Sequence, residues 1–259
     1  MRKGCFTLII GLLIYFNSIA QHDNTNLSIN KSGYFEMPGL NVMVFDDFYP
    51  EGHQGGLTIV QHGNRVAANG DLRLNDTPGQ WQPIPKMKHK TTDTAGNHIW
   101  VNLVFPDSSR HRKGFNPIDY PDLYVNYTVH VKSEGKTVRL TVDLDRPMSS
   151  EWEQKVGFNL ELYPVNLFGK SWICEEKTGI FPRQSAGPVR NGSDNEVQQV
   201  PYASGNKLTI APESDEMRMT IESKGEPLNL FDGRINHNNG WFIVRSLVKP
   251  GVSKVLLNG

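Results

Sequence analysis

The stretch "YPEGHQGGLTIVQHGNRV", residues 49–66, gathers residue types that can do chemistry. Glu51, His53 and His62 have the side chains of metal ligands and of proton-transfer groups. The residues "LTIVQ" between the two histidines read as a strand, and nine extended residues span about 30 Å. The histidines should therefore lie far apart unless the chain folds back. Because "EGHQGG" has no usual ligand spacing, the sequence predicts no metal site and no cofactor here.

Glycine placement favours a conformational role for the same stretch. Gly55 and Gly56 are expected to start a strand, and Gly63 to end it in a turn. "HGNRV" and "ANGDL" then predict successive tight turns. On this interpretation His53 keeps one candidate role, as a contact to a sugar or to a neighbouring domain.

Two long segments between strand-like runs hold most of the other candidate binding residues. "SSRHRKGFNPIDYPD" could bind a carbohydrate or a partner through its charged and aromatic side chains, or could be a solvated loop. Trp81, in "PGQWQP", is either a flat platform for a sugar ring or a core residue. Trp100 and Trp241 lie in strand-like runs and are expected in the core. The full set of candidate substrate-binding residues is His53, Trp81, Arg110, Arg112, Asp119, Arg183 and His237.

No catalytic residue can be assigned from a motif. The sequence lacks a nucleophile elbow, a glycine-rich phosphate loop, an HExxH motif and a CxxC motif. Cys174 lies in "KSWICEE" without a cysteine-protease signature around it, so we expect a buried thiol in a strand. Many carboxylates are present, but their spacing alone cannot pair them as a glycosidase would.

Charge and the first residues define the class of protein. The chain has 27 lysine and arginine residues and 27 aspartate and glutamate residues, so it carries no net positive charge that would attract nucleic acid or an anionic membrane.

The first twenty residues predict a signal peptide. They contain a positive start at Arg2 and Lys3, an apolar run from Phe6 to Phe16, and "NSIA" before Gln21. The apolar run is short for a membrane anchor. We therefore expect a secreted or periplasmic protein with no membrane association after cleavage.

Alternating apolar and polar residues dominate the rest of the chain. In "DLYVNYTVHVKSEGKTVRLTVDLD" two such runs are joined through "SEGK", which predicts a β-hairpin with one buried face. Shorter runs of the same kind recur, and no segment has a sustained helical period. The sequence predicts an all-β fold of roughly a dozen strands, a large two-sheet antiparallel β-sandwich, with the galactose-mutarotase-like supersandwich as a variant. After the signal peptide, a polar leader (21–31) is expected to precede a single β-sandwich domain (32–259).

Several segments together resemble a known family. They are "SGYFEMPGLNVMVFDDFYPEGHQGGLTIVQHGNRVAANGDLRLNDTPGQWQPIPK", "KGFNPIDYPDL", "VGFNLELYP", "GIFPRQSAGPV" and "DGRINHNNGWFIVRSLV". This combination resembles the N-terminal β-rich region of secreted, cellulase-like glycoside hydrolases of family 9 from Bacteroidetes. In that family the region precedes an immunoglobulin-like module and a helical catalytic barrel. The family's Asp-Ala-Gly-Asp type motif does not occur in this sequence, so the resemblance carries over no catalytic residue.

The resemblance implies an accessory domain for breakdown of plant polysaccharides such as glucan. Such a domain would bind a polysaccharide or oligosaccharide, or brace a glycoside hydrolase catalytic domain. Two alternatives stay open. One is a sugar-active enzyme of mutarotase type, with His53 and with Glu161 of "VGFNLELYP" on an inner sheet face as a general acid–base pair. The other is a purely structural module without a ligand.

Overall fold

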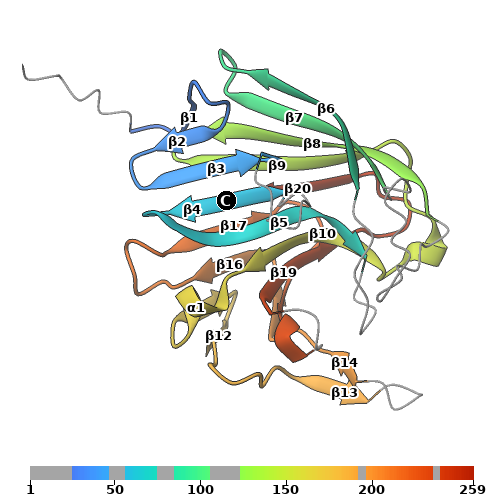
Figure 1. Ribbon diagram of the computed structural model, residues 1–259. Helices are drawn as coiled ribbons and strands as arrows, with labels where there is room; N and C mark the ends of the chain where they lie inside the picture. The colour runs from blue at the N-terminus through green and yellow to red at the C-terminus, as the bar shows by residue number, and fades with distance from the viewer. Residues whose placement is uncertain (1–24, 47–55, 75–84, 106–122, 192–196, 236–239) are drawn as a thin grey trace, which may run out of the picture.

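A computed structural model of the chain describes residues 25–46, 56–74, 85–105, 123–191, 197–235 and 240–259. These residues form two antiparallel sheets of nine strands each and one two-stranded ribbon, so the prediction of an all-β sandwich is confirmed (Figure 1). The structure has twenty strands where the sequence predicts roughly a dozen. The segment predicted to be a signal peptide, residues 1–20, falls outside the described residues. No helix within these ranges is long and apolar enough to cross a membrane.

The sheet nearer the viewer in Figure 1, called the front sheet, contains most of the N-terminal strands. Each neighbouring pair in it is antiparallel. In spatial order its strands are β1 (Ser28–Ile29), β2 (Phe35–Met37), β3 (Leu40–Val44), β4 (Leu57–Gln61), β5 (Asn64–Leu74), β10 (Val156–Leu162), β19 (Phe242–Leu247), β18 (Leu228–Asp232) and β15 (Ala203–Gly205).

The second sheet, called the back sheet, packs behind the first. Its hairpin of β8 and β9 turns at Glu134–Thr137, where the sequence places it. In spatial order its strands are β12 (Lys177–Ile180), β11 (Ser171–Cys174), β16 (Lys207–Ile210), β17 (Met219–Ser223), β20 (Lys254–Asn258), β9 (Thr137–Leu144), β8 (Val125–Glu134), β7 (His98–Phe105) and β6 (Lys86–Asp93).

Short elements complete the described fold. Strands β13 (Val189–Asn191) and β14 (Val197–Gln199) form the two-stranded ribbon. The helical elements are α1 (Pro164–Leu167) and the 3-10 turns η2 (Ser150–Trp152) and η3 (Gly233–Ile235). None exceeds four residues, so the sheets alone build the scaffold.

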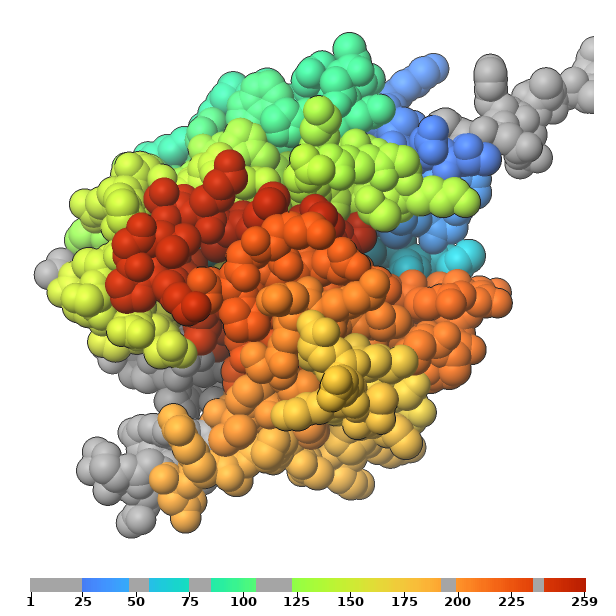
Figure 2. Space-filling model, turned by 180° about the vertical axis from the view of Figure 1, so that it is seen from behind, coloured from blue at the N-terminus to red at the C-terminus, as the bar shows by residue number. Residues whose placement is uncertain are grey.

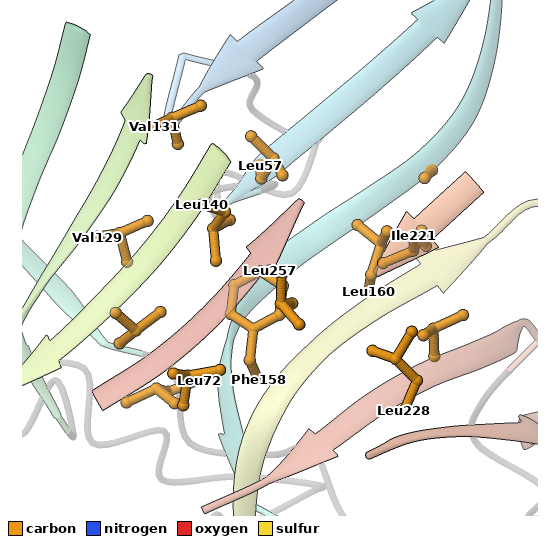
Figure 3. Packing of buried hydrophobic residues seen from close by; sticks show 14 of the residues in the cluster. Leu57, Leu72, Val129, Val131, Leu140, Phe158, Leu160, Ile221, Leu228 and Leu257 are labelled. Carbon is orange, nitrogen blue, oxygen red and sulfur yellow. The ribbon is translucent and has the colours of Figure 1, made fainter. Parts of the chain in front are cut away.

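The hydrophobic core lies between the two sheets. Figure 3 shows Leu72, Phe158 and Leu160 of the front sheet opposite Leu140 and Leu257 of the back sheet. On β7, β8 and β9 buried and accessible residues alternate, as expected for strands with one face in the core. Burial of this apolar surface is the main stabilising contribution in a chain whose described cysteine is a free thiol.

Three central strands of the front sheet differ from this pattern because they are buried on both faces. In β5 every residue from Val66 to Arg73 is buried, and β10 and β19 are almost continuously buried as well. Strand alternation places Phe158 and Leu160 in the core and therefore Asn159 and Glu161 on the opposite, outer face. The outer face of the front sheet thus encloses polar side chains.

Strand β5 contains a bulge where the sequence predicts a turn. "ANGDL" does not reverse the chain, because Ala67 to Leu72 continue the strand. Asn69 has a positive φ of 55°, and the register against β10 shifts between Asn159 and Glu161. An extra residue of this kind bends a strand and redirects its side chains. The Asn-Gly pair therefore marks a bulge.

Gly70 beside this bulge allows a close strand approach. A Cβ atom at Gly70 would lie 2.5 Å from the Leu57 Cβ and 3.1 Å from the Leu57 carbonyl oxygen. The oxygen is a main-chain atom of β4, and the Cβ is bonded directly to that main chain. Neither atom can therefore move unless the strand shifts. We expect Gly70→Ala to lower the free energy of unfolding by about 1–3 kcal/mol. Urea denaturation measures this, and Gly225→Ala, which meets no atom within 4 Å, is the control expected to change little.

The ordered fold begins earlier than the predicted domain boundary at residue 32. Leu27 is buried in the core, and Ser28 and Ile29 form β1 against β2. The Leu27 amide also donates a hydrogen bond to the Gly135 carbonyl at the β8–β9 turn. Part of the segment assigned to a polar leader therefore belongs to the sandwich.

Of the single residues placed in the core by sequence, Cys174 is confirmed and the tryptophans are not. Cys174 is buried in β11, where burial raises the pKa of its thiol. Trp100 is half-buried on the outer face of the back sheet, since its neighbours Ile99 and Val101 fill the core. Trp241 is also half-buried and packs on Tyr163 outside the main core. The alternation of residues along β7 therefore decides which face of the back sheet Trp100 occupies.

Candidate functional site on the outer face of the front sheet

Polar side chains of β5, β10 and β19 form a cluster in the middle of the front sheet. Asn159 of β10 is paired with Asp71 of β5 on one side and with Arg245 of β19 on the other. The Arg245 Nε donates to the Asn159 Oδ1 over 3.1 Å. We call Asn69, Asp71, Arg73, Asn159, Glu161 and Arg245 the polar cluster. Five of its members are buried, and Glu161 is half-buried.

Two members of the polar cluster have buried polar atoms without a hydrogen-bond partner. The Arg73 Nη1 and the Asn69 Oδ1 are inaccessible and unpaired. Their residues keep only 7% and 9% of their surface exposed. An unpaired buried polar atom costs roughly 1–3 kcal/mol, more when it is charged. Native proteins keep few such atoms. Among the described residues Gln61, Trp172 and Asn258 also carry one each, outside the polar cluster.

Asp71 is a titratable group of the cluster whose pKa is shifted from its ordinary value. Its carboxylate accepts hydrogen bonds from the Tyr127 hydroxyl of β8 over 2.6 Å and from the Leu72 amide over 2.8 Å. Tyr127 belongs to the core between the sheets, so this carboxyl is bonded toward the interior and is not accessible from the outer face. Burial raises its pKa to about 6, although the charge of Arg73 and the two hydrogen bonds oppose the rise. The same burial and the nearby Asp71 charge raise the pKa of Tyr127 well above its usual range.

Glu161 and an aromatic pair form the more accessible side of the site. The Asn69 Nδ2 donates to the Glu161 Oε2 over 2.5 Å and holds that carboxylate in place. Two residues further on, Tyr163 stacks edge-on against Trp241, with ring centroids 4.5 Å apart. The Arg65 Nη1 lies 3.5 Å from the Tyr163 hydroxyl. Planar hydrogen-bonding groups beside aromatic rings are the usual components of a carbohydrate site.

The position of Glu161 corrects one expectation from the sequence. Glu161 was expected on an inner sheet face, but Leu160 and Leu162 occupy the core and Glu161 lies on the outer face. Period-two alternation cannot decide which face of a strand is the inner one. Here both faces of β10 are buried, so the outer face is equally able to hold a site.

Most residues predicted to bind substrate lie outside the described segments. These are His53, Trp81, Arg110, Arg112, Asp119 and His237. Arg183 is described and exposed, between Phe181 and the β13–β14 ribbon. The structure gives its side chain no contact with the polar cluster. Its main-chain carbonyl, however, accepts a hydrogen bond from the Arg234 Nη1 over 2.9 Å.

That hydrogen bond belongs to a second polar network, centred on the buried Asp232. The Arg234 Nε and Nη2 each donate to one oxygen of Asp232 over 2.8 Å. The same guanidinium also donates to the main-chain carbonyls of Pro182 and Arg183. Burial would raise the pKa of Asp232, but the hydrogen bonds and charge of Arg234 outweigh it and lower that pKa. Each of the three guanidinium nitrogens donates to an acceptor within the protein, so this network is a structural clamp.

Sequence reasoning missed the residues of the polar cluster for an identifiable reason. Asp71, Arg73, Asn159 and Arg245 each lie within a strand at a position that alternates with core residues. Polar residues at such positions normally face solvent, so nothing separates them from an ordinary strand surface. A possible signal was the run of small or apolar residues "VAA" before them, which favours a strand buried on both faces.

The described residues contain no group of three or more histidine, cysteine, aspartate or glutamate side chains able to hold a metal ion. Comparison of the sequence with models of known protein families and with curated proteins found no match. The polar cluster itself is therefore the basis for assigning a function.

Proposed function

We propose that the chain is an exported accessory domain for polysaccharide breakdown and that the polar cluster is part of its carbohydrate-binding face. The observation that carries the proposal is the half-buried Glu161, whose carboxylate is held by the Asn69 amide two residues before the Tyr163–Trp241 aromatic pair. A sugar offers hydroxyl groups that both donate and accept hydrogen bonds. Such hydroxyl groups could donate to the carboxylate of Glu161, which is the half-buried and therefore accessible member of the polar cluster.

The accessible edge of the site supplies the complementary apolar contact. The C–H faces of a pyranose ring pack on aromatic rings, and Tyr163 and Trp241 hold each other at a fixed angle of 61° between their ring planes. Because these rings and Glu161 are held by neighbours, little side-chain entropy is lost on binding. Glucan remains the expected ligand class, and bracing of a glycoside hydrolase catalytic domain is the companion role implied by the sequence resemblance.

Glu161→Gln tests the proposal directly. The change keeps the shape of the side chain but removes its charge, so we expect binding to weaken at least tenfold, which equals about 1.4 kcal/mol. The measurement is a glycan-array survey of the mature protein, followed by titration calorimetry with the best oligosaccharide. Glu222→Gln on the back sheet is the matched control and should bind as the parent does. Equal affinity of Glu161→Gln and parent would contradict the proposal, as would the absence of any bound glycan.

A second function is a sugar-active enzyme of mutarotase type, in which the half-buried Glu161 beside the Tyr163–Trp241 pair would act as general acid or base. Polarimetry of aldose mutarotation and a reducing-sugar assay, run in parallel with the binding survey, separate the two functions. Activity that disappears in Glu161→Gln would establish the enzyme. Binding without turnover would establish the accessory domain.

A further inference from the structure

Two histidines meet on the outer face of the back sheet, on the opposite side of the molecule from the polar cluster. His98 is the first residue of β7 and His130 lies in β8, the neighbouring strand. The His98 Nε2 and the His130 Nδ1 are 3.2 Å apart. Both side chains are half-buried. Figure 2 shows this side of the molecule, where the green strands β6 to β9 lie beside red β20 and orange β16 and β17.

A carboxylate supports one of these imidazoles from the far side. The Asp143 Oδ2 of β9 lies 3.5 Å from the His130 Nε2. A proton on Nε2 faces that carboxylate, which leaves the lone pair of Nδ1 directed toward His98. Histidine ligands of metal ions are commonly oriented by such a carboxylate on the second ring nitrogen, which fixes the tautomer and raises the basicity of the ligating atom.

We propose that His98 and His130 bind a late first-row divalent transition metal ion through His98 Nε2 and His130 Nδ1, with Asp143 orienting His130. Water fills the remaining coordination positions, because the described residues offer no group of three or more ligands. The site is independent of the carbohydrate face on the front sheet. It shares no residue with the polar cluster.

The separation of the two nitrogens matches that of neighbouring ligands on one ion. Two nitrogens that each lie about 2.0–2.1 Å from zinc are about 3.3 Å apart at a tetrahedral angle. The present separation is 3.2 Å. The ring centroids are 5.3 Å apart and the planes differ by 24°, so the two rings face each other nearly end to end. Each ring must turn about its Cβ–Cγ bond to aim its lone pair at a shared ion, which half-exposed side chains can do.

The chemistry of the ligands sets an expected order of ions. Imidazole nitrogen suits copper, nickel and zinc, and affinity for a given site rises to Cu²⁺ and falls again at Zn²⁺. Mg²⁺ and Ca²⁺ require oxygen ligands and are not expected to bind at this pair. The flanking Lys254, whose Nζ lies 3.4 Å from the Asp143 Oδ1, must turn away as positive charge enters the site.

The test uses the tag-free mature protein, titrated with CuCl₂ and with ZnCl₂ by calorimetry at pH 7. We expect His98→Gln and His130→Gln each to weaken Cu²⁺ binding at least tenfold, with Zn²⁺ weaker than Cu²⁺ in the parent. His89→Gln, an exposed histidine on the adjacent strand β6, is the matched control and should retain the parent affinity. If the double variant of His98 and His130 binds Cu²⁺ as tightly as the parent, the ion is held elsewhere and the proposal is wrong.

A second measurement locates the ion within the molecule. The Trp100 ring lies with its centroid 4.8 Å from that of His98, and Cu²⁺ quenches tryptophan fluorescence at short range. We expect saturable quenching in the parent that is lost in the double variant and largely lost in Trp100→Phe. Quenching that persists unchanged in both variants would show that Cu²⁺ binds near another tryptophan, which also overturns the proposal.

Discussion

Replacing Arg234 with alanine is expected to lower the free energy of unfolding by about 3–5 kcal/mol, the largest effect of any single change considered for this fold. Asp232 has no exposed side-chain surface, and Arg234 is the cation that forms a bidentate pair with it. Without the guanidinium a carboxylate would remain buried with weaker donors, chiefly the Tyr202 hydroxyl at 3.2 Å. The main-chain carbonyls of Pro182 and Arg183 would also lose their donor.

Companion variants separate the buried charge from loss of packing. The Arg234 guanidinium stacks 4.4 Å from the Phe242 ring centroid, so part of the loss comes from that contact. The double change Asp232→Asn with Arg234→Met removes both charges and keeps an apolar side chain, so it should destabilise less than Arg234→Ala. Arg218→Ala breaks an exposed ion pair with Asp215 and should cost under about 1 kcal/mol. Chemical denaturation ranks the three; an Arg234→Ala effect no larger than that of Arg218→Ala would contradict the clamp.

The second large effect concerns pH and Asp71. The folded-state pKa of about 6 exceeds the ordinary value of 3.8, so the folded protein binds more protons than the unfolded chain between these values. Stability from this group is therefore fully present below about pH 4 and is lost as pH rises to about 6. A difference of about two pKa units corresponds to about 3 kcal/mol. Asp71→Asn cannot ionise, so relative to the parent it should gain about that amount between pH 4 and pH 7.

Urea denaturation of parent and Asp71→Asn at several pH values between 4 and 7 measures this difference. Taking the difference removes the contribution of groups that titrate alike in both proteins. Tyr127→Phe provides an internal check, because loss of that hydrogen bond removes an influence that lowers the Asp71 pKa. The decline of stability in Tyr127→Phe should therefore extend to higher pH. A parent–variant difference that stays constant across the range would show that Asp71 titrates normally.

Local alternation of apolar residues predicts much of this fold. The β8–β9 hairpin, the strand at Leu57–Gln61 and the buried thiol of Cys174 follow from patterns of a few residues. The same alternation indicates that Trp100 lies on the outer face of its sheet, because its neighbours Ile99 and Val101 point into the core. A tryptophan in a strand is more often a core residue, but in β7 the core positions belong to Ile99 and Val101.

What the sequence could not predict depends on contacts between distant segments. Nothing near Arg234 indicates that its guanidinium reaches the carbonyls of residues 182–184, about fifty residues earlier. The clamp joins "GIFPRQSAGPV" to "DGRIN", two of the segments on which the family resemblance rests. Likewise, Asp71 and Arg73 read as solvent-facing strand residues. Asp71 in fact bonds to Tyr127 of β8, a residue of the other sheet, and no local pattern encodes that contact.

The placement of β20 has a consequence for the order of folding. This strand, Lys254–Asn258, lies between β17 and β9 in the back sheet, and it pairs with Arg139–Asp143 more than a hundred residues earlier in the chain. Until it is in place, β9 and β17 each present an unpaired edge, and the two halves of the sheet share no hydrogen bonds. Closing such a long loop is slow. Until it closes, the unpaired strand edges can pair with strands of other chains. Assembly of the back sheet is therefore a late event, and intermediates that lack β20 are the species most exposed to misassociation.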